Sequence, residues 1–210
     1  MKILSLNVGR PREVEWNGKS IRTGIFKSAV IGKRKVSFLH IEGDEQADLR
    51  VHGGVNKAVY AYDFSHYQYW KTVLQRESWE YGLFGENLTT EGLLDTAVRI
   101  GDIYGVGTAK LRVVQPRFPC AKLNIRFGLP NMMERFMEEK RNGIYFSVVE
   151  EGEVQAGDAI NLVEPSHYPV TIRQYVDCYY SKGKDKLLLN TILSIPLLPE
   201  TQQRAFEGFL

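Results

Sequence analysis

Residues 97–116, with the sequence AVRIGDIYGVGTAKLRVVQP, decide the fold class of this chain. The runs 97–100 and 109–114 are rich in β-branched and apolar residues, a composition that favours extended strands. Gly101-Asp102 lies directly after the first run, and a glycine beside an aspartate favours a tight turn. The stretch therefore predicts short strands joined by turns, as in a β-barrel or a β-sandwich.

The same pattern extends to both sides of this stretch. The sequence predicts further strands at residues 2–8, 24–31, 35–41, 59–62, 145–149 and 159–163. Gly157-Asp158 repeats the Gly101-Asp102 pair and predicts a second turn of the same kind. Apolar residues at helical spacing predict helices at 64–77 and 132–140 and a helical turn at 121–126. We therefore expect a mainly β fold with helical insertions.

The composition changes at Glu164-Pro165. Beyond it, apolar residues recur every three or four positions and predict three short helices at 170–179, 184–194 and 199–209. We expect a β-rich domain over residues 1–165 and a three-helix extension over 166–210. Because so few residues are only marginally stable as an independent fold, we expect this extension to pack on the β-rich domain or on a second copy of the chain.

Composition excludes several classes of protein. The chain has 210 residues, 43% of them apolar and 25% charged, which is typical of a globular domain. The net charge of +2 is too small to drive stable nucleic-acid binding by itself. No apolar run is long enough to span a membrane, and the first residues lack the apolar core of a secretory signal, so we expect a cytoplasmic protein. The two cysteines, Cys120 and Cys178, are then expected to be thiols.

The segment 115–127, QPRFPCAKLNIRF, is the strongest candidate for chemistry. Two prolines restrict the backbone before Cys120 and hold that side chain at a fixed position. Arg117, Lys122 and Arg126 favour its thiolate, the form that attacks electrophiles or ligates soft metals. The alternative is a buried, inert cysteine, because free cysteines are often buried.

Two further segments carry polar groups that could bind a ligand. Residues 48–58, DLRVHGGVNKA, contain His52, Gly53, Gly54 and Lys57, which fit either a phosphate-binding loop or a plain turn. Residues 84–92, FGENLTTEG, contain Asn87 and Thr89, which fit either contacts to a heterocycle or a capped turn. The spacing of neither a P-loop nor a zinc site is present. A hydrolase site built from Cys120, His52 and Asp48 has no supporting signature.

Taken together and in this order, several segments resemble the MOSC domain, a family named for the C-terminal part of molybdenum cofactor sulfurases. The resemblance is strongest to its stand-alone, YiiM-like bacterial group and covers nearly the whole chain. The matching segments are ILSLNVG (3–9), TGIFK (23–27), GDEQADLRVHGGVNKAVYAY (43–62), HYQYW (66–70), FGENLT (84–89) and QPRFPCAKLNIRFG (115–128). The helices beyond residue 166 look like the extension typical of this group.

The resemblance implies a MOSC-type β-barrel, followed by a small C-terminal three-helix bundle, whose cavity binds a molybdenum–pterin cofactor. It implies that Cys120 matches the family cysteine and is the thiolate ligand of molybdenum. Basic residues would then offset the charge of the pterin phosphate, and the candidates are Lys57, Arg117, Lys122 and Arg126. The residues expected to line the pterin are His52, Gly53, Gly54, Asn87 and Thr89.

The activity implied by the resemblance is that of an oxidoreductase. Such a protein reduces N-hydroxylated compounds, for example 6-hydroxylaminopurine and hydroxylamines, to amines, with electrons from a separate flavoprotein reductase. Two alternatives use the same residues without this turnover. The protein could carry or store the cofactor, or Cys120 could carry sulfur as a persulfide.

Overall fold

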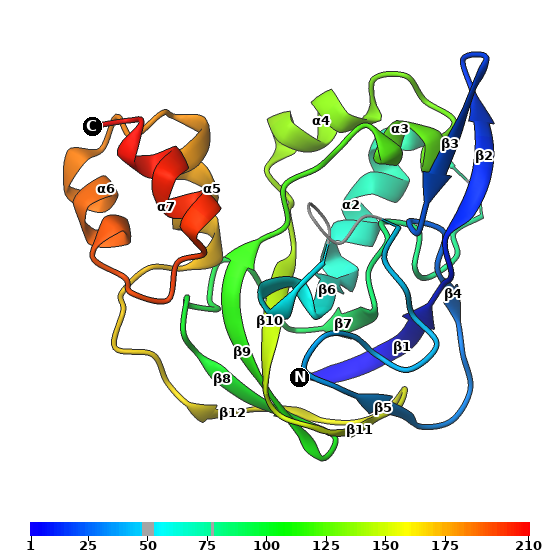
Figure 1. The fold of residues 1–210 in the computed structure, drawn as a ribbon, viewed down its shortest axis with the longest axis horizontal. Helices are drawn as coiled ribbons and strands as arrows, with labels where there is room; N and C mark the ends of the chain where they lie inside the picture. Colours follow the sequence, from blue (N-terminus) through cyan, green and yellow to red (C-terminus); the bar gives the residue numbers. More distant parts are fainter. Residues whose placement is uncertain (48–52, 77) are drawn as a thin grey trace.

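A single large β-sheet forms the centre of the protein in the computed structural model, which describes residues 1–47, 53–76 and 78–210 (Figure 1). The sheet has eight strands in the order β12-β8-β9-β10-β6-β7-β1-β4. β6 and β7 are parallel, and the other neighbours are antiparallel. In chain order, the strands are β1 (Lys2–Val8), β4 (Ser28–Ala29), β6 (Val59–Asp63), β7 (Leu88–Glu91), β8 (Ile103–Val106), β9 (Ala109–Pro116), β10 (Ile144–Glu150) and β12 (Ile160–Glu164).

The expected closed barrel is not found among the described residues, which form an open sheet within a mixed α/β fold. β1 and β12 do approach each other at one end, where Lys2 and Ala159 form an isolated bridge. There the amide of Ile3 donates to the carbonyl of Asp158 at 2.9 Å, and the amide of Ile160 donates to that of Met1 at 2.8 Å. Beyond this point β12 pairs only with β8, and its last four residues are exposed, so the ladder stays open.

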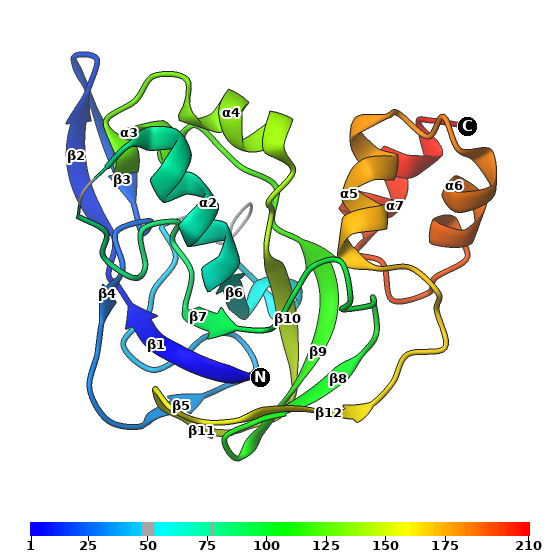
Figure 2. The same cartoon turned by 180° about the vertical axis from the view of Figure 1, so that it is seen from behind.

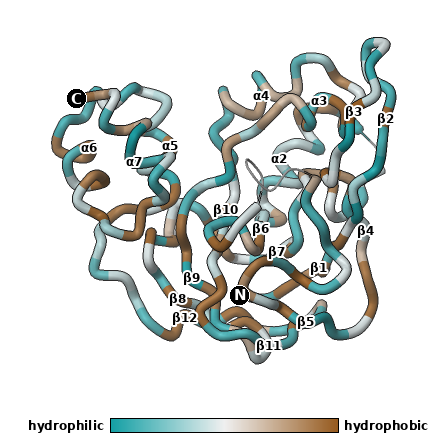
Figure 3. Tube along the Cα trace, viewed as in Figure 1, coloured by the Kyte–Doolittle hydropathy of each residue, from teal (hydrophilic) through white to brown (hydrophobic). Residues whose placement is uncertain are grey.

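Two short ribbons lie outside the large sheet. β2 (Arg12–Trp16) pairs with β3 (Lys19–Thr23), and β5 (Arg34–Val36) pairs with β11 (Gly152–Val154). The β2–β3 turn has positive φ at both central residues, 51° at Asn17 and 73° at Gly18, as in the tight hairpins that Asn-Gly favours. This hairpin is mostly hydrophilic along its length (Figure 3).

The two Gly-Asp pairs form the same turn, as the sequence predicts. Gly101 and Gly157 both have φ of 93°, a conformation that favours glycine. Each aspartate carboxylate accepts a hydrogen bond from the amide three residues earlier, at 2.8 Å for Asp102 and 2.9 Å for Asp158. Residues 97–100, however, form a turn and no strand. Val98 and Ile100 are buried, and the amide of Ile100 donates to the carbonyl of Val170 at 2.9 Å.

The helices lie in two groups, and Figures 1 and 2 show the C-terminal group at one end of the molecule. One group contains α2 (Phe64–Leu74), α3 (Lys122–Phe127) and α4 (Met132–Glu139), with the short 3-10 helix η1 (Val55–Lys57) nearby in the sequence. The other contains α5 (Ile172–Tyr180), α6 (Lys186–Leu193) and α7 (Glu200–Glu207), close to the ranges predicted from the sequence. Among the described residues, no helix is long and apolar enough to cross a membrane.

Two hydrophobic clusters hold these elements together. The larger joins the inner side chains of the sheet to the C-terminal helices through residues such as Tyr175, Leu189 and Phe206. The expected packing of the C-terminal helices against the β-rich part is therefore present. The smaller cluster is mainly aromatic and joins α2, α3 and α4, with Trp70 and Phe136 stacked at 5.9 Å. The division of the chain at residues 165 and 166 into domains stays a prediction.

Candidate functional site

The Cys120 loop leads from β9 into α3 and borders an open cavity. Pro116 is the last residue of β9, and Lys122 is the first residue of α3. Cys120 is half-buried, lines the cavity and forms no disulfide. Cys120 is therefore not the fully buried cysteine of the alternative, and whether its thiol is reactive stays a prediction. Cys178 differs: it is 1% exposed within α5, and burial raises the pKa of its thiol.

The cavity is open to solvent, and its space, the open mouth included, is about 640 Å³. Its described cationic residues are Lys27, Lys57, Arg117 and Lys122, and its one described acidic residue is Glu45. Apolar and aromatic walls come from Ile25, Tyr60, Phe84, Phe118 and Tyr145. The walls are thus largely apolar, and the charge is predominantly positive, which suits an anionic ligand.

Arg117 is the most unusual group at this site. It is only 6% exposed, and its guanidinium carbon lies 5.4 Å from the ring centre of Phe136 and 5.7 Å from that of Tyr60. Burial alone would lower the pKa of Arg117, but the neighbouring Tyr60 and Cys120 outweigh it and raise the pKa above its usual value. Among the described residues its Nη1 atom has no hydrogen-bond partner. A buried donor of this kind costs free energy unless an acceptor from a ligand or water reaches it.

The backbone of Arg117 is fixed from two sides. Its amide donates to the carbonyl of Gly143 at 3.3 Å, and its carbonyl accepts from Nδ2 of Asn142 at 2.9 Å. Gly143 has φ of 71°, and a Cβ there would lie 2.7 Å from the carbonyl oxygen of Ala61, so glycine allows this close approach. Phe118, the next residue, packs on Tyr179 of α5 with ring centres 4.3 Å apart. The loop is therefore held by residues 142 and 143, directly before β10, and by the C-terminal helices.

A buried ion pair supports the opposite wall. Nζ of Lys27 lies 2.5 Å from Oδ2 of Asp44, and their side chains are 9% and 0% exposed. Asp44 also accepts hydrogen bonds from the Gly9 amide at 3.0 Å and from Nδ2 of Asn87 at 2.9 Å. Asn87 in turn accepts from the Tyr60 amide at 3.1 Å. These contacts fix Lys27 and Asn87 at the cavity.

The structure places some of the sequence-predicted site residues around one cavity and others elsewhere. Of the expected residues, the structure brings Cys120, Lys57, Asn87, Arg117 and Lys122 to the same cavity. Burial lowers the pKa of Lys57. His52 lies outside the described residues, as does Asp48. Whether any of these residues binds a cofactor stays a prediction.

Four expected residues do not line this cavity. Thr89 is fully buried, donates to Glu86 at 2.7 Å and accepts from Asn7 at 3.1 Å, so it supports the interior. Arg126 packs on the Phe26 ring at 5.1 Å. Gly53 and Gly54 are not among the lining residues, and Gly54 serves to begin η1 with φ of 89°.

Sequence reasoning missed several lining residues, chiefly Lys27, Tyr60, Phe118 and Tyr145. Burial raises the pKa of both tyrosines, so their hydroxyls stay protonated. The hydroxyl of Tyr60 donates to the carbonyl of Asn142 at 3.0 Å. A signal for Lys27 existed, because it is a cation directly after the apolar pair of the GIFK segment. Tyr60 and Tyr145 resemble ordinary strand residues, and only the pairing of β6 with β10 places them together.

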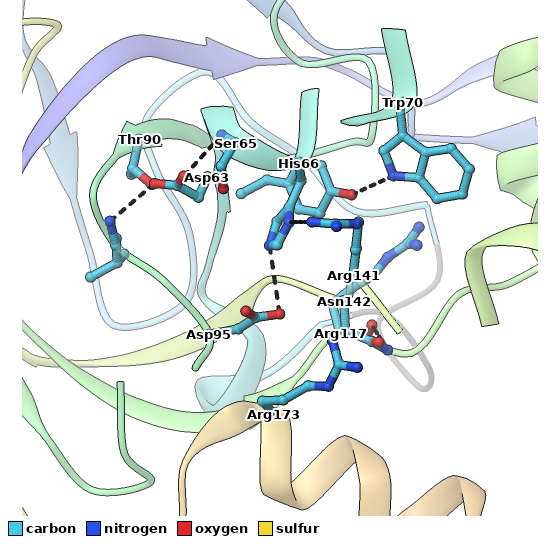
Figure 4. A network of polar contacts seen from close by, with 12 residues as sticks. Asp63, Ser65, His66, Trp70, Thr90, Asp95, Arg117, Arg141, Asn142 and Arg173 are labelled. Carbon is cyan, nitrogen blue, oxygen red and sulfur yellow. Dashed lines mark hydrogen bonds and ion pairs between the residues drawn. The ribbon is translucent and has the colours of Figure 1, made fainter. Parts of the chain in front are cut away.

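The buried histidine His66 belongs to the polar network of Figure 4 and is not a lining residue of the cavity. Nη1 of Arg141 lies 3.2 Å from its Nδ1, and Oδ2 of Asp95 lies 3.6 Å from its Nε2. A guanidinium only donates, so Nδ1 accepts and the proton of the neutral ring is on Nε2, facing Asp95. Burial, together with Arg141, lowers the pKa of His66 to about 4. His66 is therefore a structural residue, and the described residues include no cluster of potential metal ligands.

The half-buried thiol of Cys120 and four of the described cationic residues thus share one open cavity, an arrangement that suits an anionic ligand. Residues 48–161 match the family model of the MOSC domain. The chain also shares 38% identity over 208 residues with the uncharacterized protein YflK of Bacillus subtilis, covering 97% of this chain and 92% of that protein. This chain belongs to the MOSC domain family.

Two further comparisons bear on this membership. The crystal structure of YiiM from Geobacillus stearothermophilus superimposes with a TM-score of 0.83 at 31% identity, covering 100% of this chain and 98% of that one. A protein of Gibberella moniliformis named "Reductase" is 36% identical over 165 residues. The match covers 77% of this chain but only 29% of the fungal protein. The chain is thus YiiM-like over its whole length and similar to one part of a longer reductase.

Proposed function

We propose that the protein binds a molybdenum–pterin cofactor in the cavity and reduces N-hydroxylated compounds, such as 6-hydroxylaminopurine or hydroxylamines, to amines. The observation that carries this proposal is Arg117, which lines the same cavity as Cys120 and whose buried Nη1 has no hydrogen-bond partner among the described residues. Leaving such a donor unpaired costs about 1–3 kcal/mol, so it points to a ligand with acceptor oxygens. A phosphate fits this requirement.

The residues present fit the proposed cofactor. Cys120 offers a thiolate, which suits a soft metal site, and the cavity side chains of Lys57, Arg117 and Lys122 suit a phosphate. When bound, the cofactor would supply the two-electron redox chemistry at the N–O bond, while the protein binds and orients the reactants. The name of the Gibberella relative is consistent with reductase activity.

The remaining lining residues would position the substrate. Phe84 and Phe118 offer apolar surfaces for a flat base. The protonated hydroxyl of Tyr145 can donate a hydrogen bond, and Lys27, held by Asp44, keeps a cation at the wall. We expect electrons from a separate flavoprotein reductase.

Cofactor content is the first test. The full-length protein is purified from a host that makes the cofactor, and molybdenum and pterin are measured per chain. We expect both in the wild type, a large loss in Cys120→Ser, and no loss in Cys178→Ser, whose thiol is buried in α5. A folded wild type without molybdenum and pterin would contradict the proposal.

Turnover separates an enzyme from a carrier. With a flavoprotein reductase present, we expect many molecules of 6-hydroxylaminopurine to be reduced per chain. A cofactor carrier gives no catalytic turnover. A persulfide carrier instead gains about 32 Da at Cys120 after exposure to a sulfur donor.

A further inference from the structure

A second recess lies on the outer face of α2. It encloses about 620 Å³, its open mouth included. None of its lining residues lines the cavity that contains Cys120. The lining residues are Phe64, Tyr67, Gln68, Lys71, Trp79 and Tyr81.

Tyr67 is the fixed base of this aromatic recess. It is 3% exposed, and its ring centre lies 6.4 Å from that of Phe64, 6.0 Å from that of Trp79 and 5.8 Å from that of Tyr81. Its hydroxyl donates to Glu86 at 2.5 Å and accepts from the Leu83 amide at 3.1 Å. These bonds prevent the ring from turning out of its place.

The walls are anchored as well. Nε1 of Trp79 donates to the carbonyl of Arg76 at 2.7 Å, while the Trp79 side chain stays partly exposed. Phe64 and Tyr81 meet edge to face at 6.3 Å. Aromatic surfaces held in this way suit a flat ring, because little conformational entropy is lost when they bind one.

The polar groups at the rim decide the charge of the ligand. Lys71 is exposed and forms no ion pair with another described residue. The Arg76 guanidinium lies 6.0 Å from the Trp79 ring. Among the described residues of this segment the acid is Glu80, which is 84% exposed and lies 3.9 Å from Arg126. Aromatic recesses attract cations, but the two cations here oppose a positively charged ligand. Lys71 and Arg76 therefore favour an anionic ligand. The exposed side-chain amide of Gln68 can form hydrogen bonds with the edge of a heterocycle.

We propose that this recess is a second ligand site, which takes a planar heteroaromatic ring with an anionic tail, the chemistry of a mononucleotide. The ring lies against Tyr67 and Trp79, and Lys71 faces the anionic tail. The inference is independent of the molybdenum proposal, because it uses none of the cavity residues and its test needs no bound cofactor.

Flavin mononucleotide tests this site directly, because stacking on tryptophan quenches its fluorescence. Riboflavin has the same ring without the phosphate and serves as the uncharged comparison. We expect the purified full-length chain to bind flavin mononucleotide several times more tightly than riboflavin. Lys71→Met should remove this difference, and Trp79→Leu should weaken both ligands by about tenfold or more. Lys71 is exposed, so its substitution leaves folding intact.

Lys122→Met is the matched control, because it removes a cation from the other cavity. We expect it to leave flavin mononucleotide binding unchanged. Binding that is lost in Lys122→Met and retained in Trp79→Leu would overturn the proposal, since the ligand would then occupy the other cavity. Failure of both flavin mononucleotide and AMP to bind below about 1 mM would overturn it as well.

Discussion

Removing the carboxylate of Asp44 should destabilise the protein severely. The side chain of Asp44 is fully buried and accepts from Lys27 at 2.5 Å, Gly9 at 3.0 Å and Asn87 at 2.9 Å. Asp44→Ala would leave the ammonium of Lys27, itself 9% exposed, buried without its counter-ion. It would also leave two donors unpaired.

The magnitude follows from these contacts. Breaking a buried ion pair by removing one partner costs about 3–5 kcal/mol, because the remaining charge stays desolvated. This is a large part of the 5–15 kcal/mol, roughly, by which a domain is stable. Asp44→Asn keeps the shape and some hydrogen bonds, so we expect a smaller loss. Lys27→Met in the Asp44→Asn background should recover part of it, because neither buried charge is then left alone.

Urea unfolding, followed by tryptophan fluorescence, measures these differences as shifts in the midpoint at constant slope. The surface pair Lys2–Glu91 is the matched control, since its atoms are 2.9 Å apart but its side chains are 51% and 56% exposed. Glu91→Ala should cost less than about 1 kcal/mol. A loss of less than about 1 kcal/mol in Asp44→Ala, or strictly additive effects of Lys27→Met and Asp44→Asn, would refute the reasoning.

Three further outcomes are expected. Arg117→Met removes the buried Nη1 donor that has no partner among the described residues. We expect this variant to fold but to contain less molybdenum and pterin per chain, and a wild-type cofactor content would contradict the proposed role of Arg117. Phe118→Ala should lower the free energy of unfolding by about 2 kcal/mol, which is less than the loss expected at a fully buried phenylalanine, because Phe118 is only partly buried against Tyr179. Differential scanning calorimetry measures this loss. The pKa of His66 lies at about 4 in the folded protein and near 6.5 when unfolded, so the unfolded state binds the extra proton. Stability should therefore fall as the pH drops from about 6.5 to 4, by up to roughly 3 kcal/mol, and His66→Gln should flatten this dependence in urea titrations.

Local sequence patterns predicted the helices, because the spacing of apolar residues within a short segment is enough to indicate a helix. The helix at 64–77 was placed from its apolar face and ends earlier, at Leu74, because Gln75 adopts a left-handed conformation with φ of 48°. The three C-terminal helices were placed in the same way. Strand β7 was missed, because its sequence LTTE reads as a polar turn. Its threonines are buried because Thr89 bonds to Glu86 and Thr90 to Asp63, partners that only the fold supplies.

The same distinction applies to the site. Arg117, Cys120 and Lys122 were predicted together because one rigid segment carries them. Arg126 was included for the same reason, but the short helix α3 turns it towards Phe26 and Glu80. Lys27 reaches the cavity through tertiary contact with Asp44, which no local pattern reveals.

Through the contact between Phe118 and α5, the C-terminal helices support the Cys120 loop. Ending the chain before residue 166 would expose one face of the Phe118 ring. The neighbouring Arg117 would then be held only by the hydrogen bonds of its backbone to Asn142 and Gly143. In a protein shortened in this way for crystallisation or fusion, the loop that carries Cys120 would thus be less rigid, even if every cavity residue were retained.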